Sequence, residues 1–328
     1  MRAITQDIYG SVEVLRLTQI ARPVPADDEV LVHVHAAGVD RGVWHLMAGL
    51  PYLMRFVGFG LRAPKQRVRG MDLAGRVEAV GPRVRRFKPG DLVYGACDGS
   101  FAEYACTRED RLAYKPNNLR FDQAAAVPVS AVTALQALQD VGQVQPGHRV
   151  LIIGAAGGVG SFAVQLAKAF GAVVTGVCST GKLDLVRSLG ADEVIDYTRE
   201  DFADRPGHYD LILDIAGNRS LAHVRRALAP KGTLVLVGGE GGGRFFGGLG
   251  RTLWALLVSA FVSQKLRGLL AIPRSKDLER LTALIEAGKL TPVIERMYPL
   301  AAAADAIRHM SEGHARGKLV ISIDQGEH

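Results

Sequence analysis

The sequence feature that most limits how this chain can fold is a glycine-rich turn, GAAGGVG, at residues 154–160. An apolar strand candidate, residues 149–153, precedes the turn, and a helix candidate, residues 159–170, follows it. Glycines with this GxxGxxG spacing let the chain reverse sharply, let the backbone approach a pyrophosphate and let the helix lie close to the sheet. Free N–H groups and the helix dipole then attract phosphates. We therefore predict a dinucleotide site here, the alternative being a glycine-rich turn without a ligand.

Strands and helices alternate on the C-terminal side of this turn. The strand candidates are almost continuously apolar, which is typical of a parallel sheet covered on both faces. The sequence therefore predicts an α/β fold with a doubly wound parallel sheet. The expected strands are residues 149–153, 173–178, 194–195, 209–214 and 233–237, and the expected helices are residues 159–170, 182–189 and 220–228.

The first third of the chain is predicted to be rich in short strands. Valines alternate over residues 30–36, and glycine and proline turns separate the further candidates. A final strand is expected to return to this first domain, which makes the domain discontinuous. We expect strands at 70–80, 92–94, 101–104 and 318–323, helices at 123–141, 252–264 and 278–287, and a glycine-rich loop at 238–250. The expected domains are 1–129 with 272–328, which is β-rich, and 130–271, which binds the dinucleotide.

Residues after the second strand of the predicted sheet indicate which dinucleotide binds. An NAD site usually has an acidic residue there, for the ribose 2′-OH. This chain has Ser179, Thr180 and Lys182 instead, which suit a 2′-phosphate, and Tyr197 after the third strand can approach the same place. The alternative is that Ser179 and Thr180 cap the following helix, and both roles are compatible. The sequence favours NADPH over NADH.

Composition excludes several classes of protein. The chain has 48% hydrophobic and 22% charged residues, as expected for a globular fold, and a net charge of +7. Its basic clusters do not alternate with aromatic residues, so nucleic-acid binding is not expected. Its three cysteines form no CxxC pair, which favours a reducing compartment, and no Cys/His spacing resembles a zinc site.

Location and assembly follow from two further features. No signal peptide is evident, so we expect a cytoplasmic protein without a membrane partner. The apolar segment 252–264 is too short to cross a bilayer, which takes about 20 residues. We expect it to be a buried or interface helix, with a membrane-surface helix as the lesser alternative. A homodimer built on this helix or on a shared sheet edge is predicted.

A series of motifs in order along nearly the whole chain carries a family resemblance. The sequence resembles the medium-chain dehydrogenase/reductase superfamily and, within it, the quinone oxidoreductase (zeta-crystallin-like) branch. The resemblance implies a GroES-like catalytic domain beside the Rossmann domain. The motifs are AGVD (37–40), GMDLAG (70–75), KPGDLVYG (88–95), GSFAEY (99–104), VTAL (132–135), AAGGVGSFAVQLAK (155–168), LGAD (189–192), DY (196–197) and RGKLV (316–320).

The resemblance also implies the absence of zinc. Zinc-dependent members have ligands where this chain has Asp40, Met71 with Asp72, and about Val129, and they carry a four-cysteine lobe that has no counterpart here. Two aspartates cannot build such a site. Zinc-free relatives usually have asparagine in place of Asp40. We consider three states for Asp40: paired with Arg41, a proton donor with a raised pKa, or a solvated loop aspartate.

By the same resemblance, the chain reduces a quinone, an enone or another activated carbonyl. The alternatives are a zinc-free secondary-alcohol dehydrogenase and a non-catalytic NADPH-binding protein. Three residues expected on a loop are candidates to stabilise the substrate oxygen: Arg41, His45 and Tyr52. An apolar lid, or alternatively packing in the core or at a dimer contact, is expected for Trp44, Leu53, Phe56, Trp254 and Phe261. The expected catalytic residues are Asp40, Arg41 and Tyr52, and the expected cofactor residues are Thr133, Gly154, Ala156, Gly157, Gly158, Val159, Gly160, Ser179, Thr180, Lys182, Tyr197, Ala216, Gly217, Gly238, Gly239 and Lys318.

Overall fold

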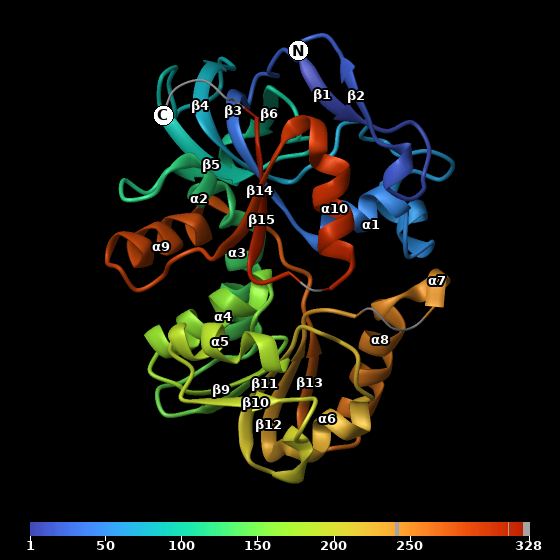
Figure 1. Ribbon diagram of the computed structural model, residues 1–328, viewed down its shortest axis with the longest axis vertical. Helices are drawn as coiled ribbons and strands as arrows, with labels where there is room; N and C mark the ends of the chain where they lie inside the picture. The colour runs from blue at the N-terminus through green and yellow to red at the C-terminus, as the bar shows by residue number, and fades with distance from the viewer. Residues whose placement is uncertain (240–242, 314, 324–328) are drawn as a thin grey trace. The chain divides into compact units, whose positions relative to one another are not determined.

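The computed structural model describes residues 1–239, 243–313 and 315–323 and divides the chain into two compact units (Figure 1). One unit comprises Met1–Val132 and Ile272–His328, and the other comprises Thr133–Ala271. Helix α3 (Pro128–Gln136) carries the chain from the first unit into the second. Residues 240–242 of the expected glycine-rich loop and residues 324–328 of the expected first domain lie outside the described residues.

The second unit contains a six-stranded sheet in which all neighbouring strands are parallel. The strand order β10-β9-β8-β11-β12-β13 starts at the centre and grows outward in both directions, which is the Rossmann arrangement. This confirms the predicted doubly wound parallel sheet. The strands are β8 (Arg149–Ile153), β9 (Val173–Cys178), β10 (Glu193–Asp196), β11 (Tyr209–Asp214), β12 (Leu228–Leu236) and β13 (Lys265–Gly268).

Helices cover this sheet in two groups (Figure 1). Helices α4 and α5 lie against β8, β9 and β10, whereas α6 and α8 lie against β12 and β13. No described helix is both long enough and apolar enough to span a membrane. The helices are α4 (Gly158–Ala169), α5 (Leu183–Ser188), α6 (Leu221–Ala227), α7 (Gly243–Phe246) and α8 (Gly248–Ser259).

Two segments of the second unit differ from the sequence prediction. The expected loop 238–250 contains α7 and the start of α8, and the expected helix 252–264 ends at Ser259. The chain then turns and forms the edge strand β13, which was not predicted. β13 has only four residues, and its buried Leu266 lies between the exposed Lys265 and Arg267, so its apolar signal is weak.

The helix expected at residues 123–141 is broken into three segments. Helix α2 (Phe121–Ala125) ends before Pro128, α3 follows, and a π-helical turn covers Ala137–Val141. Proline has no N–H for the preceding turn and disfavours a helical conformation at the residue before it, which explains the first break.

The first unit is built on a seven-stranded sheet. β3 is its longest strand; Val30, Val32 and Val34 are fully buried, and β15 pairs with β3 in antiparallel orientation. The end of the described chain therefore returns to the sheet formed by the first third. The seven strands are β3 (Glu29–Val39), β4 (Asp72–Val80), β5 (Leu92–Ala96), β6 (Tyr104–Arg108), β7 (Leu112–Tyr114), β14 (Ile294–Pro299) and β15 (Lys318–Ser322). A separate two-stranded sheet is formed by β1 (Arg2–Thr5) and β2 (Arg16–Gln19).

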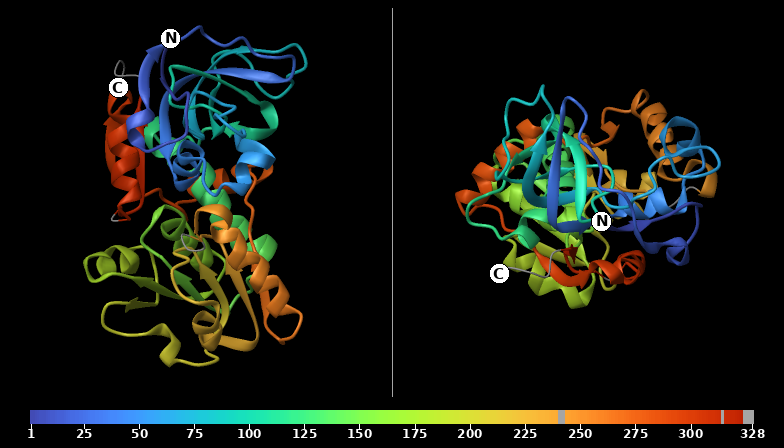
Figure 2. Two further views of the ribbon diagram at one scale, coloured as in Figure 1. Left: turned by 90° about the vertical axis from the view of Figure 1, so that its right-hand side faces the viewer. Right: turned by 90° about the horizontal axis from the view of Figure 1, so that it is seen from above.

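Three further helices lie in this unit: α1 (Arg41–Ala48), α9 (Ser275–Glu286) and α10 (Ala303–Ser311). Helices α1 and α10 contact each other beside the sheet (Figure 2). The predicted strand 101–104 is largely wrong, because only Ala102 makes an isolated bridge, to Ala3, before β6 begins. The unit is the β-rich GroES-like domain that was expected.

Candidate functional site

The glycine turn joins β8 to α4 as predicted. Each of the three glycines of its GxxGxxG pattern has a different structural role. Gly154 has a φ of +91°, which favours glycine. A Cβ at Gly160 would lie 2.1 Å from the carbonyl oxygen of Gly154, so only glycine lets the helix approach so closely. A Cβ at Gly157 would meet only that same oxygen, at 3.6 Å, so the face at Gly157 is open.

The open face lies at the N-terminus of α4. Gly157 is the N-cap of this twelve-residue helix, Ala156 belongs to the turn, and Gly158 and Val159 begin the helix. The first N–H groups of a helix have no intrahelical partner and carry partial positive charge. A pyrophosphate can approach them here without meeting a side chain at Gly157. The turn thus fits the phosphates of a dinucleotide.

The ends of β9 and β10 bring the predicted 2′-phosphate residues together. Cys178 and Asp196 are register partners, and the N–H of Tyr197 donates to the Cys178 carbonyl at 3.2 Å. The N–H of Lys182 donates to the Ser179 carbonyl at 2.9 Å, which holds both residues in one turn. Ser179, Lys182 and Tyr197 therefore surround the same corner of the sheet.

The hydroxyls of Ser179 and Thr180 do not cap the following helical turns, so the capping alternative is wrong. Ser179 precedes the 3-10 turn Thr180–Lys182 without a side-chain cap, and its hydroxyl makes no hydrogen bond with the described part of the chain. The Thr180 hydroxyl donates to Asp196, which is 4% exposed. This bond, with those from Thr198, holds the pKa of Asp196 below its usual value. Thr180 therefore has no hydroxyl proton left to donate to a phosphate.

Segments after β11 and β12 meet at the same sheet edge as the glycine turn. Gly217 has a φ of +65°, and a Cβ there would lie 2.8 Å from the Gly238 carbonyl oxygen. A Cβ at Gly238 would lie 2.0 Å from the Ile215 carbonyl oxygen. Ala216 donates its N–H to the carbonyl of Ile153, the last residue of β8. Ligands of open α/β sheets bind at this edge. Gly239 adjoins this group, and Thr133 lies on α3.

In the first unit, Asp72 and Lys318 form a buried ion pair. Their side chains are 0% and 2% exposed, and the Lys318 ammonium lies 3.0 Å from one Asp72 oxygen. The other Asp72 oxygen accepts from the N–H of Val129 at 2.7 Å. A Cβ at Gly38 would lie 2.6 Å from Asp72, which explains glycine at that position of β3. Both Asp72 oxygens are thus bonded by the chain itself.

Asp40 is buried beside this pair, so the solvated-loop alternative is wrong. It is 8% exposed and caps α1, where one carboxyl oxygen accepts from the N–H of Val43 at 3.3 Å. The other oxygen is buried without a hydrogen-bond partner. Burial, helped by the charge of Asp72 and opposed by that of Lys318, raises the pKa of Asp40 to about 6. The carboxyl can thus hold a proton at mildly acidic pH.

Comparisons with known sequences match parts of both units to domains of dehydrogenases. The alcohol dehydrogenase GroES-like domain matches residues 26–117, and the zinc-binding dehydrogenase domain matches residues 189–321. A 2-methylene-furan-3-one reductase of Solanum lycopersicum is 35% identical over 98% of this chain and 79% of its own length. A chloroplastic quinone-oxidoreductase homolog of Spinacia oleracea is 33% identical over 98% of both chains.

The chain belongs to the medium-chain dehydrogenase/reductase superfamily, in its quinone oxidoreductase branch. Solved structures agree: the quinone oxidoreductase of Coxiella burnetii superposes with a TM-score of 0.86 at 29% identity over 99% of both chains. An NAD-dependent alcohol dehydrogenase has a TM-score of 0.85 at 30% identity over 99% of this chain and 100% of its own. Members of this superfamily are oxidoreductases that use a nicotinamide cofactor.

The zinc named in one of the matching domains does not fit the residues of this superfamily member. Among the described residues, no group of three or more His, Cys, Asp or Glu side chains is placed to hold a metal. The position of a third ligand is the apolar Val129, and the Lys318 ammonium already binds Asp72. A second cation at this place would be repelled. The three cysteines are free.

Of the remaining candidate residues, Arg41 and His45 lie on α1 rather than on a loop, whereas Tyr52 lies in the turn that follows α1. The guanidinium of Arg41 lies 5.8 Å from the centre of the Trp44 ring, and His45 bonds the Leu50 carbonyl through Nδ1 at 3.0 Å. Tyr52 lies under the Arg55 guanidinium at 4.7 Å. These side chains have packing roles, and their catalytic roles remain predictions.

The proposed lid residues are divided between the two units. Trp44 packs against the core of the first unit, which agrees with the core alternative for this residue. Phe56 is 68% exposed, and in the second unit Trp254 and Phe261 are 60% and 88% exposed.

Two buried acidic residues are not predicted from the sequence. Asp196 is the last residue of β10, and only its register with Cys178 shows that it orders Thr180. Asp214, at the end of β11, accepts from the N–H of Gly217 at 2.9 Å and from Arg251 at 2.5 Å. An acidic residue that ends each of two successive strands was the available signal. Both groups order the sheet edge at which ligands of open α/β sheets bind.

The raised pKa of Asp40 predicts a pH dependence of stability. The carboxyl titrates near 3.9 in the unfolded chain and at about 6 in the folded protein, so its protonated form favours folding. The stabilisation is complete below pH 4 and is lost as the pH rises through 6. Relative to Asp40→Asn, which keeps the capping oxygen, the wild type should lose roughly 2–3 kcal/mol between pH 4 and 7. Urea unfolding of both proteins at several pH values measures this, and parallel curves would refute it.

Proposed function

We propose that this protein is an NADPH-dependent reductase that transfers hydride to a quinone, an enone or another activated carbonyl without zinc. The observation that carries the proposal is the open face of Gly157 at the start of α4, beside the sheet corner formed by Ser179, Lys182 and Tyr197. The relatives support the reaction class, since they are named as quinone and alkenal/one oxidoreductases.

The bound nicotinamide supplies the hydride, and the chain supplies binding and charge. In the proposal, the first N–H groups of α4 bind the pyrophosphate, and Ser179, Lys182 and Tyr197 bind the 2′-phosphate. Ala216, Gly217, Gly238, Gly239 and Thr133 are assigned to the nicotinamide end, as the resemblance implies. Lys318 is better assigned to Asp72, which it already contacts, than to the cofactor.

Asp40 is proposed as the proton donor. Reduction of an enone consumes one hydride and one proton, so the carboxyl would give its proton to the substrate and regain it from solvent. Its unpartnered buried oxygen and its pKa of about 6 support this role. Arg41 and Tyr52 are proposed to donate hydrogen bonds to the substrate oxygen.

A panel of acceptors tests the reaction. NADPH oxidation should be observed with quinones and enones, and Asp40→Asn should lower kcat far more than it raises KM. Turnover only of secondary alcohols with NADP⁺ would favour the alcohol dehydrogenase alternative, for which the superposed alcohol dehydrogenase is an argument. Tight NADPH binding without turnover of any acceptor would favour a binding protein.

Metal content gives a separate prediction. The purified protein should contain no stoichiometric zinc, because both Asp72 oxygens are bonded by Val129 and Lys318 and the described residues hold no group of three or more His, Cys, Asp or Glu side chains placed to bind a metal. Atomic emission on the isolated protein measures this. About one zinc per chain, removed by a chelator together with the activity, would contradict it.

A homodimer is also part of the proposal. β13 is the edge strand of the six-stranded sheet, so its outer backbone groups can pair with a second copy. We expect light scattering at micromolar concentration to give twice the mass of one chain. A monomer under these conditions would contradict the sheet-edge interface. The sparse cysteines support the further proposal of a cytoplasmic location.

A further inference from the structure

Helix α8 and the preceding α7 expose a large apolar surface. Eight side chains between residues 245 and 261 are between 37% and 88% exposed. We call them the α8 face: Phe245, Phe246, Leu249, Leu253, Trp254, Leu256, Leu257 and Phe261. Single exposed apolar residues are common, whereas a contiguous group of this size marks a surface that binds something.

The geometry of the helix makes this face continuous. Leu249, Leu253, Leu256 and Leu257 follow the three- and four-residue spacing that places side chains on one side of a helix. Ala255, on the other side, is fully buried against the sheet. Arg251 fixes the helix further, because it donates to Asp214 at 2.5 Å and to the Arg219 carbonyl at 3.0 Å. The contacts of Ala255 and Arg251 therefore fix the orientation of α8 on the sheet, with the α8 face turned away from the sheet.

The charged residues of the segment that carries the face are all basic. Residues 243–271 contain four basic residues, Arg244, Arg251, Lys265 and Arg267, and no acidic residue. The whole chain carries a net charge of +7. Arg251 is used by Asp214, which leaves Arg244, Lys265 and Arg267 as the basic residues of this segment. Apolar and aromatic side chains on a segment whose other charges are basic are typical of segments that lie in the surface of an anionic membrane.

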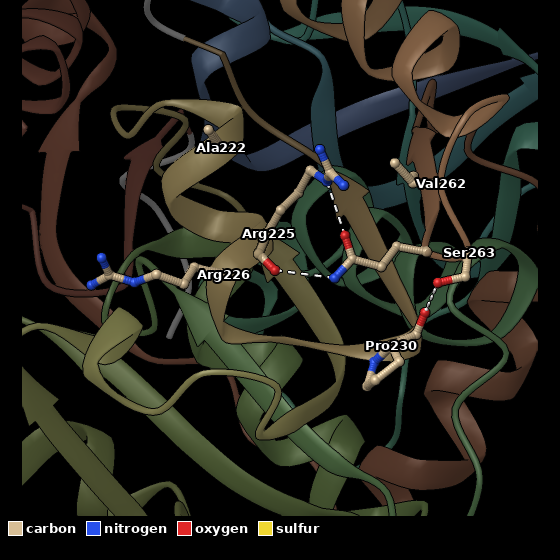
Figure 3. Close-up of a pocket in the computed structure, with 7 residues that line it drawn as sticks. Ala222, Arg225, Arg226, Pro230, Val262 and Ser263 are labelled. Carbon is tan, nitrogen blue, oxygen red and sulfur yellow. Dashed lines mark hydrogen bonds between the residues drawn. The ribbon is translucent and has the colours of Figure 1, made fainter.

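A pocket lies at Val262 and Ser263, which follow the last residue of the face in the sequence, and Figure 3 shows the residues that line it. It has a volume of about 510 Å³ and is lined by Arg225, Arg226, Val262 and Gln264 among others. Of its two arginines, Arg226 is paired with Asp204 at 3.4 Å. Arg225 donates through Nε to Gln264 at 2.9 Å, and Gln264 donates back to the Arg225 carbonyl at 3.1 Å. Within the described part of the chain, no carboxylate forms an ion pair with Arg225. Its terminal nitrogens are therefore available to a phosphate.

We propose that the α8 face binds the surface of a membrane that contains anionic phospholipid, with the Arg225 pocket receiving a headgroup phosphate. Apolar side chains enter the boundary of the acyl layer, and the basic residues of the segment lie at the phosphates. A second copy is a poorer partner for this face, because a two-fold contact would bring the same basic residues together. This revises the sequence-based expectation of no membrane partner, and it is independent of the reaction.

Vesicle sedimentation with the full chain tests the proposal. The wild type should sediment with vesicles that contain phosphatidylglycerol and much less with pure phosphatidylcholine. High salt should release it, and the emission of Trp254 should shift to shorter wavelength on binding. Leu253→Glu with Leu257→Glu should weaken binding at least about tenfold. Arg225→Met should weaken it about fivefold, as expected for one basic residue at an anionic surface.

Matched controls lie at the opposite side of the same sheet. Val173→Glu alters an exposed apolar residue on β9, and Arg187→Met removes one positive charge from α5. Both should bind vesicles like the wild type. Equal binding to both kinds of vesicle, or equal losses in the control variants, would overturn the proposal. A wild type that binds neither kind of vesicle would also overturn the proposal. In that case, loss of the dimer in the Leu253→Glu, Leu257→Glu variant would show that the face binds a second copy of the chain.

Discussion

Replacing Gly157 by aspartate is expected to abolish NADPH binding while the protein remains folded. Gly157 is in extended backbone, with a φ of −82°, and a Cβ there meets nothing closer than 3.6 Å. The substitution therefore costs little in the folded protein. A carboxylate at the N-cap of α4 would instead occupy the place of the pyrophosphate and repel it. An affinity loss on the order of 100-fold is expected, as for removal of a charge-assisted contact and its replacement by a like charge.

Two variants at the same position separate charge from bulk. Gly157→Asn has the size of aspartate without its charge, and it should retain more of the affinity than Gly157→Asp. Gly157→Ala adds only the Cβ and should bind nearly as the wild type does. Titration calorimetry measures affinity, and circular dichroism with thermal unfolding checks the fold. Unchanged affinity in Gly157→Asp would show that the pyrophosphate lies elsewhere.

Gly160 cannot serve the same purpose. From the sequence alone, both glycines are equivalent positions of one motif, and aspartate at either is expected to leave the fold intact. The structure contradicts this for Gly160, whose Cβ would lie 2.1 Å from the Gly154 carbonyl oxygen and 2.8 Å from Ala155. Gly160→Ala should lower the free energy of unfolding by about 1–3 kcal/mol through overpacking. The difference between the two glycines is a matter of packing that spacing does not reveal.

The sequence predicts best those features that are local. β8, β9 and β11 have the predicted bounds, because a strand that is covered on both faces is mostly apolar and leaves a clear pattern in the sequence. β13 was missed because it is short and alternates between charged and buried residues. β14 was missed for a similar reason, since most of its side chains are exposed or half-buried and leave no clear pattern.

In the candidate site, too, the features formed by consecutive residues are predictable and those formed by distant residues are not. The glycine turn is predictable because its strand, turn and helix are consecutive. The Asp72–Lys318 pair joins residues 246 positions apart, and it exists only because β15 pairs with β3 and β3 with β4. The burial of Asp40 depends on the same packing. The local sequence around Asp40 is therefore compatible with a solvated loop as well as with a buried carboxyl. Fold-level contacts thus decide the chemistry of this aspartate.

The second large effect is expected in the choice between NADPH and NADH. Lys182 and Ser179 are held in one turn by the 2.9 Å backbone bond, and Tyr197 follows the paired end of β10. The Ser179 hydroxyl makes no bond within the described chain, whereas that of Thr180 is committed to Asp196. We therefore expect Ser179 and Lys182 to determine the preference, with Thr180 acting through Asp196. Thr180→Ala should matter less than either.

The measurement is the ratio of the dissociation constants for NADPH and NADH in each variant. A substitution that perturbs the fold weakens both cofactors alike and leaves this ratio unchanged. A charge-assisted hydrogen bond contributes roughly 1.5–3 kcal/mol, so Lys182→Ala should weaken NADPH binding by about 10- to 150-fold. NADH has no 2′-phosphate, and its affinity should hardly change. Ser179→Asp should reverse the preference, because its carboxylate repels the phosphate and can accept from a free ribose 2′-OH. Lys231→Ala removes one exposed positive charge from the first half of β12, at the opposite end of the strands, and should leave the ratio unchanged. If the wild type binds both cofactors equally, or if Lys182→Ala weakens both alike, this corner of the sheet does not bind a 2′-phosphate.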